Sequence, residues 1–150
     1  MKWPLLSCAL ALLMSGCGDF PRDPDGTLKR VKSEGVFRVG LVAPLDERQL
    51  DGEARELLRR LADRSGAAPR VERGPGEPLL DRLEKGQLDL VLGRFEKKSP
   101  WSTLVTFGPP LRVERSGATD IHLTAAMRNG ENAWISLVER ESRDAARQAP

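Results

Sequence analysis

Apolar positions along this chain follow two patterns, and the first of them predicts helices. Four segments place apolar residues three or four positions apart, which is the spacing of one face of a helix. These segments are residues 27–34, the stretch between Gly52 and Gly66, the stretch between Pro78 and Gly86, and the stretch that follows Asn129. Gly35, Gly66 and Gly86 are expected to end the first three, because glycine accepts the left-handed conformation that closes a helix. Asn129 is a suitable N-cap for the last.

Short apolar runs between these segments predict strands. The predicted strands are residues 36–42, 70–72, 88–92 and 121–127. The first and third are nearly continuous apolar runs, typical of parallel strands that are covered on both faces. The charges of the second indicate an edge strand. Gly93-Arg94 is expected to open the loop after the third strand, and residues 111–120 are polar and irregular, so we expect no regular element there.

The order of these elements predicts the fold class. Strand, helix, strand, helix, strand favours a mostly parallel sheet with right-handed crossovers and helices on both faces, which is a three-layer α/β domain. With 150 residues the chain has room for one such domain. Ligands of open α/β sheets bind beyond the carboxyl ends of the strands. The loops after the first and third strands are therefore the expected place for a binding site.

These two loops carry a plausible set of ligand-binding groups. The candidate residues are Pro44, Leu45, Arg94, Ser99 and Trp101. Together they offer a guanidinium, a hydroxyl, an indole face and free backbone amides, which suit a small zwitterion or carboxylate. Two readings stay open at this point: Arg94 is either a ligand group or a solvated surface arginine, and Trp101 either stacks on a ligand or packs in the core.

Catalysis, metal binding and nucleic-acid binding are not expected. The net charge of +2 comes from 24 basic and 22 acidic residues that are scattered along the chain, so no basic patch points to nucleic acid. His122 is the single histidine and has no cysteine or acidic partner at metal-ligand spacing. No nucleophile elbow or phosphate-binding loop is present. We therefore expect no enzyme and no cofactor.

Three motifs carry a family resemblance. They are KGQLDLVLG at residues 85–93, FGPPL at residues 107–111, and GENAW at residues 130–134. In this order they resemble the bacterial periplasmic solute-binding proteins that serve amino-acid-type ABC importers (solute-binding protein family 3). The resemblance implies one lobe of a type II periplasmic binding protein, which captures a small polar or amino-acid-like solute and delivers it to an ABC permease.

The chain departs from that family in two ways. The family loop usually reads Thr-Pro-x-Arg, but Ser99-Pro100-Trp101-Ser102 has no arginine at the matching place. The usual protein also has two lobes that close over the solute, whereas this chain has the length of one. The alternative is therefore a non-catalytic envelope lipoprotein whose reduced lobe docks on a transporter or sensor protein and binds no solute.

The N-terminus predicts export and lipidation. Met1-Lys2 is followed by an apolar segment of about ten residues, too short to span a bilayer, and then by Ser15-Gly16-Cys17, which resembles a lipobox. We expect residues 1–16 to be a lipoprotein signal peptide, 17–26 a lipidated tether and 27–150 the lobe. Removal of Cys8 with the signal would leave Cys17 unpaired, which favours acylation. The expected location is the periplasm, anchored at either the inner or the outer membrane.

Overall fold

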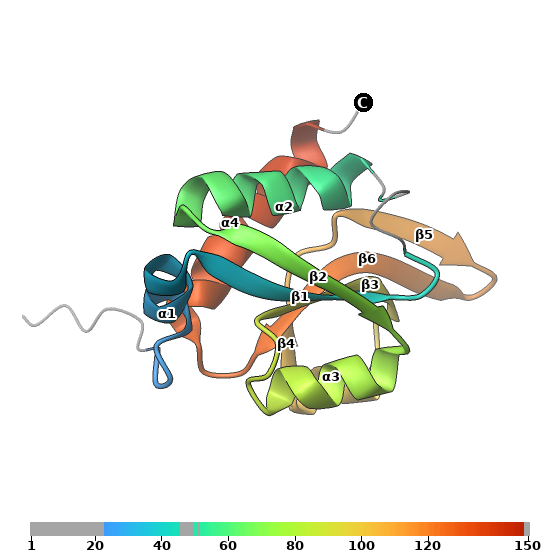
Figure 1. The fold of residues 1–150 in the computed structure, drawn as a ribbon. Helices are drawn as coiled ribbons and strands as arrows, with labels where there is room; N and C mark the ends of the chain where they lie inside the picture. The colour runs from blue at the N-terminus through green and yellow to red at the C-terminus, as the bar shows by residue number, and fades with distance from the viewer. Residues whose placement is uncertain (1–22, 46–49, 51, 149–150) are drawn as a thin grey trace, which may run out of the picture.

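The computed structural model describes residues 23–45, 50 and 52–148, which form a sheet with helices on both faces (Figure 1). In chain order the elements are α1 (Thr27–Glu34), β1 (Val36–Val42), α2 (Gly52–Ser65), β2 (Ala68–Gly74), α3 (Gly76–Glu84), β3 (Leu90–Glu96), the 3-10 helix η2 (Pro100–Thr103), β4 (Val105–Phe107), β5 (Arg112–Ser116), β6 (Thr119–Arg128) and α4 (Asn132–Gln148). None of the helices in these residues is long and apolar enough to cross a membrane.

The sheet has six strands in the order β2-β1-β3-β6-β4, with β5 also paired to β6. Strand β1 is parallel to both β2 and β3. Strand β6 is antiparallel to each of its neighbours β3, β4 and β5. Strands β1 to β5 therefore all run one way and only β6 runs the other, which confirms the mostly parallel three-layer α/β fold.

The two faces of the sheet are covered unequally (Figure 1). Helices α1, α2 and α4 bury the larger hydrophobic cluster against one face, which includes Phe37, Leu57 and Trp134. Helix α3 covers the other face with a smaller cluster built on Leu79, Leu80 and Leu83. Because side chains alternate along a strand, Leu90 and Leu92 of β3 belong to the larger cluster and Val91 to the smaller one.

Glycines end the first two helices as predicted. Gly35 and Gly66 have φ values of 68° and 69°, and their N–H groups donate to the carbonyls of Val31 and Ala62. Gly86 also has a positive φ of 70°, although α3 already ends at Glu84. The left-handed conformation that glycine adopts without strain therefore sets where α1 and α2 turn back toward the sheet.

The prediction that Gly93-Arg94 opens a loop is wrong. Strand β3 continues through both residues because β6 pairs with it as far as Glu96, opposite Ile121. Gly93 lies inside the strand, where an added Cβ would stand 2.8 Å from the ring of Phe95 and 2.9 Å from Val42 Cβ. A glycine is therefore required here because neighbouring side chains approach the backbone closely, and not because the chain turns.

Two further expectations for the second half of the chain are wrong. Residues 111–120, expected to be irregular, contain β5 and the start of β6, which form a hairpin at Gly117. Asn129 does not cap the last helix, which begins at Asn132. The Asn129 side chain instead accepts a hydrogen bond from the Thr106 hydroxyl and donates one to the Thr103 carbonyl.

The chain just before α1 is hydrogen-bonded to the folded domain. The carboxylate of Glu131, which is 1% exposed, accepts hydrogen bonds from the backbone N–H groups of Asp25 and Thr27, both at 2.9 Å. Asp23 accepts one from Leu28 N at 2.9 Å. Residues 23–26, assigned to the tether by sequence, thus contact the folded lobe. The predicted signal peptide and Cys17 lie outside the described residues.

Candidate solute-binding edge

The loop after β1 contributes one exposed and one buried candidate residue. Pro44 follows a cis peptide bond and is exposed. Leu45 is 3% exposed and packs in the larger hydrophobic cluster. Its N–H donates to the Val42 carbonyl at 3.0 Å, which folds the chain back over the end of β1. Pro44 is therefore accessible at this edge, whereas the Leu45 side chain stabilises the core.

Arg94 lies within β3, not on a loop. It follows Leu90 and Leu92 at two-residue spacing, so its side chain points to the face of the larger cluster. Its Nε lies 3.4 Å from Glu114 Oε2, and the Arg94 and Glu114 side chains are 27% and 41% exposed. The guanidinium is thus held near the carboxyl end of the sheet by a carboxylate from β5.

Arg94 and Glu114 belong to a line of alternating charges that crosses the sheet edge. Arg112 Nη1 lies 3.9 Å from Glu114 Oε1, and Arg112 Nε donates to Glu53 Oε1 at 2.9 Å. Burial alone would raise the pKa of Glu53, but the hydrogen bond from Arg112, a backbone hydrogen bond and the charge of Arg112 together outweigh it and lower the pKa below its usual range. We call Glu53, Arg112, Glu114 and Arg94 the charge ladder.

The charge ladder was missed in the sequence, although one signal for it existed. Arg112 and Glu114 alternate with Val113, which is the two-residue period of a strand with a polar face. The partners of both residues lie far along the chain, in α2 and β3. Local sequence therefore indicates the strand but not the ion pairs that it makes.

Ser99 and Trp101 lie in the loop after β3. The Ser99 hydroxyl accepts a hydrogen bond from Trp101 N at 3.4 Å and caps η2, and Ser99 is 8% exposed. Trp101 is half-buried and packs on the smaller cluster with Phe95 and Phe107. The rings of Phe95 and Phe107 lie with their centroids 5.0 Å apart. Ser99 thus shapes the loop, and Trp101 rests on the α3 side of the sheet.

The five candidates therefore do not converge on one face. Arg94 and Leu45 belong to the side covered by α1, α2 and α4, whereas Trp101 packs on the side covered by α3. Only a ligand that lies across the strand ends can contact both Arg94 and Trp101. The structure does place all of them at or near the carboxyl ends of β1 and β3, as the parallel arrangement requires.

The opposite end of the sheet holds a tighter polar cluster, centred on Asp89. Its carboxylate accepts hydrogen bonds from Arg38 N and Arg38 Nη2, both at 2.7 Å, and from the Arg30 guanidinium. Burial would raise the pKa of Asp89, but the hydrogen bonds from the Arg38 side chain and backbone and from Arg30 lower it below its usual value. Trp134 Nε1 donates to the Asp89 carbonyl at 2.7 Å.

The Asp89 cluster explains two of the motifs. Asp89 is the aspartate of KGQLDLVLG, and Trp134 is the tryptophan of GENAW. The hydrogen bond between them joins the start of β3 to α4, and Glu131 of the same GENAW motif holds the chain before α1. These motif residues therefore build the fold of the lobe and do not contact the candidate edge.

Comparison with known proteins assigns the fold. No family model and no curated protein matches the sequence. Among solved structures, a point mutant of domain 1 of TmArgBP in its arginine-bound form superimposes with a TM-score of 0.67 at 19% identity. The alignment covers 80% of this chain and 98% of that domain. This chain therefore has the fold of one lobe of a type II periplasmic binding protein.

Two other neighbours of this lobe carry similar descriptions. An ancestral cationic amino-acid solute-binding protein matches with a TM-score of 0.66, 12% identity and coverage of 81% of this chain and 94% of that one. The substrate-binding protein AbpA of an amino-acid ABC transporter from Streptococcus pneumoniae, bound to L-arginine, matches with a TM-score of 0.62, 12% identity and coverage of 77% and 91%. All three are described as binding proteins.

Proposed function

We propose that this chain is a lipid-anchored substrate-binding protein of an ABC-type importer, which captures a small amino-acid-like solute at the carboxyl edge of its sheet without catalysis. One observation carries the proposal. The lobe corresponds to almost the whole of TmArgBP domain 1, and that isolated domain is described in an arginine-bound form. A single lobe of this fold is thus sufficient to hold a solute in at least one protein, so the length of this chain is compatible with binding.

The charge ladder supports a zwitterionic solute. The Arg94 to Glu114 separation of 3.4 Å is longer than the 2.7–2.9 Å of a strong charge-assisted hydrogen bond. A solute carboxylate that replaces Glu114 on Arg94 gains a bidentate partner, and the released Glu114 becomes available to the ammonium group of the same solute. Arg94 and Glu114 each gain a charged partner from the solute in this exchange, so we expect its electrostatic cost to be small.

A single lobe is expected to bind weakly. The solute stays in contact with water on the side where a second lobe would close, and affinity depends on desolvation and preorganisation. Capture for transport then works best where the binding protein is concentrated near its permease. The lipid anchor on Cys17 in our proposal has this effect, because two attached acyl chains hold a protein durably at a membrane.

The docking alternative is favoured by two exposed apolar side chains, one near each end of β6. Leu104, just after η2, is 44% exposed, and Val113 on β5 is 54% exposed. The loop Ser99-Pro100-Trp101-Ser102 also lacks the arginine of the family pattern. In this alternative the lobe contacts a transporter or sensor protein and binds no solute.

A thermal-shift screen distinguishes the two functions. The full chain, in a zwitterionic detergent, is heated with arginine, other amino acids, polyamines and small carboxylates at millimolar concentration. A solute at one hundred times its dissociation constant stabilises the fold by about 2.7 kcal/mol, which is a readily measured rise in midpoint. We expect a rise with an amino acid that the Arg94→Gln variant loses.

The control for that screen is Arg115→Gln. Like Arg94, Arg115 on β5 forms an ion pair. Its side chain is 81% exposed, and its Nε lies 3.5 Å from Asp120 Oδ1. This variant changes the net charge by the same amount and should keep the rise. A cooperative melt with no shift for any compound would favour the docking alternative, and an equal loss in both variants would exclude Arg94 as the binding group.

A further inference from the structure

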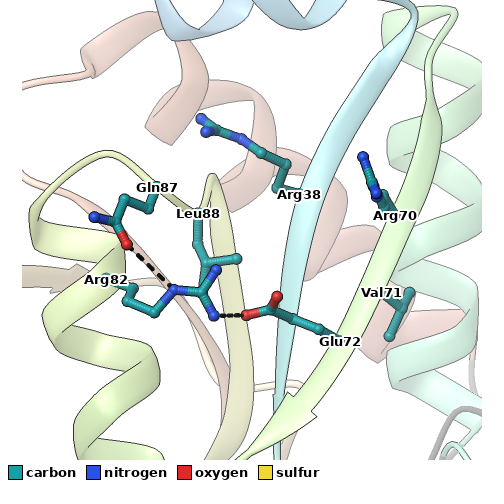
Figure 2. A pocket seen from close by; sticks show the side chains of 7 residues that line it. All are labelled: Arg38, Arg70, Val71, Glu72, Arg82, Gln87 and Leu88. Carbon is teal, nitrogen blue, oxygen red and sulfur yellow. Dashed lines mark hydrogen bonds and ion pairs between the residues drawn. The ribbon is translucent and has the colours of Figure 1, made fainter.

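A second polar site lies away from the carboxyl edge, toward the amino ends of β1, β2 and β3. It is a concave notch of about 300 Å³ on the α3 side of the sheet. Figure 2 shows side chains from β1, β2, α3 and the loop before β3 around it. We call it the arginine notch and define it by Arg38, Arg70, Glu72, Arg82 and Gln87.

The arginine notch carries an excess of positive charge. Arg38 and Arg70 are register partners on β1 and β2, so their guanidinium groups start from adjacent points of the sheet. Arg82 reaches over from α3 to the carboxylate of Glu72 on β2 and to Gln87 Oε1 (Figure 2). Three guanidinium groups thus share one lining carboxylate, and although Asp89 pairs with Arg38, it is also shared with Arg30.

Several N–H groups of these arginines stay available for a ligand. Within the described residues Arg70 makes no ion pair or side-chain hydrogen bond. Arg38 uses its Nε and Nη2 on Asp89 and Gly86, and Arg82 uses its Nε and Nη1 on Gln87 and Glu72. In the same part of the chain, Nη1 of Arg38 and Nη2 of Arg82 have no hydrogen-bond acceptor.

Internal bonds fix two of the three arginines, Arg38 and Arg82, in place. Arg38 is held by the buried Asp89, and Arg82 is held by Glu72 and Gln87, so both guanidinium planes are positioned before a ligand arrives. Preorganised arginines lose little conformational freedom on binding an oxyanion, and their planar forks match the geometry of phosphate and carboxylate oxygens. A notch with fixed donors and a net positive charge suits a compact anion.

We propose that the arginine notch binds a small multivalent oxyanion of the phosphate type, either free or as the headgroup of an anionic lipid. Of the three arginines, Arg70 makes no ion pair with any residue that the structure describes, while Arg38 and Arg82 add oriented N–H donors. The carboxylate of Glu72 repels the anion, so we expect a moderate affinity. This site is separate from the carboxyl edge, and it stands whether or not that edge captures a solute.

The test is a calorimetric titration of inorganic phosphate into the full chain in a zwitterionic detergent, at constant ionic strength in chloride. Arg70→Gln should weaken binding about tenfold, because a charge-assisted fork to the anion is lost. The matched control is Arg73→Gln on the same strand. Residue 73 alternates to the opposite face of β2, so its loss should change the affinity less than twofold.

A pair of glutamate variants makes the reverse prediction. Glu72→Gln should raise phosphate affinity severalfold, because it removes the opposing charge and releases Arg82. Glu77→Gln in the first turn of α3 changes the net charge equally and should leave the affinity unchanged. A gain in both variants would show that only overall charge matters and would overturn the proposal.

A second titration identifies the source of the anion. Short-chain phosphatidic acid is compared with short-chain phosphatidylcholine for the wild type, Arg70→Gln and Arg73→Gln. Phosphate binding that Arg70→Gln weakens supports a free oxyanion. Binding of phosphatidic acid alone, again weakened by Arg70→Gln, supports a lipid headgroup. No binding in either titration, or equal behaviour of the two arginine variants, would overturn the site.

Discussion

Two arginine–carboxylate pairs at opposite ends of the sheet differ in almost every respect. At the amino end, Asp89 has a 2% exposed side chain and accepts hydrogen bonds from Arg38 at 2.7 Å through both backbone and side chain. At the carboxyl end, Glu114 is 41% exposed and lies 3.4 Å from Arg94. The first pair is buried and saturated with donors, while the second is open to water and loosely joined.

The difference distinguishes an ion pair that holds the fold together from one that can change partners. A buried carboxylate that satisfies two arginines and a backbone N–H cannot change partners without leaving charges unpaired. A half-exposed pair can exchange with solvent or with a ligand at little cost. The amino end therefore fixes how α1, β1, β3 and α4 assemble, whereas the pair of Arg94 and Glu114 at the carboxyl end is exposed enough to exchange partners.

The largest effect should come from breaking the buried pair. Asp89→Asn removes the charge that Arg30 and Arg38 share and should lower the free energy of unfolding by about 3 kcal/mol, the low end for a broken buried pair because both arginines are partly exposed. Urea unfolding followed by circular dichroism measures it. Asp81→Asn, at an exposed i,i+4 pair with Lys85, is the control and should cost under about 0.5 kcal/mol.

A second variant breaks the link between that pair and α4. Trp134→Phe removes the donor to the Asp89 carbonyl and leaves a small cavity beside Phe37, whose ring centroid lies 5.9 Å from that of Trp134. We expect a loss of about 2 kcal/mol in the same urea experiment. Trp101→Phe, at the half-buried site, should cost less than about 1 kcal/mol. Equal costs would contradict the distinction between the two ends.

Acid should lower the free energy of unfolding by a smaller amount, through protonation of Asp89. The pKa of Asp89 is lowered in the folded state from its usual value of 3.8, so the folded state favours the ionised form more than the unfolded state does. Its contribution is present above pH 4 and is lost as the pH falls through the folded-state pKa. Stability measured between pH 6 and pH 3 should therefore fall more steeply for the wild type than for Asp89→Asn. Parallel curves would contradict this.

The smallest effect on stability should come from the carboxyl end. Glu114→Gln should lower the free energy of unfolding by less than about 1 kcal/mol, because the Arg94 pair is half-exposed and long. The same variant should change solute affinity, since Glu114 is the proposed partner of the solute ammonium group. A stability loss comparable to that of Asp89→Asn would show that the charge ladder is structural and not exchangeable.

Much of the fold is predictable from local signals. The bounds of α1 and β1 agree with the sequence prediction residue for residue, since Gly35 marks the junction and the apolar run 36–42 is continuous. The β5–β6 hairpin was missed because Arg112 and Glu114 look like loop residues until their distant partners are known. Strand β3 extends past Gly93 for the same kind of reason, since its end depends on pairing with β6.

The place of the candidate residues in the sheet was predicted more successfully than the direction of their side chains. Parallel topology places the ends of β1 and β3 together, and that follows from the order of elements alone. Whether a side chain points into the core or to the edge depends on its strand register. Leu45 therefore turned out to be buried, and Arg94 and Trp101 lie on different faces of the sheet. For the Asp89 cluster, the sequence showed the motifs that contain its residues but not the hydrogen bonds that join them.

The two hydrogen bonds that Glu131 accepts from the chain before α1 would also determine which side of the lobe lies nearest to a lipid on Cys17. Asp23 is six positions from Cys17, so a lipid on Cys17 would stand at most about 20 Å from it. In our proposal the lobe is therefore attached to the membrane on the side of α1. Figure 1 shows α1 and the tip of the β5–β6 hairpin at opposite ends of the lobe. With this attachment, the end of the lobe that holds the amino ends of the strands would face the bilayer, and the carboxyl edge of the sheet would face away from it.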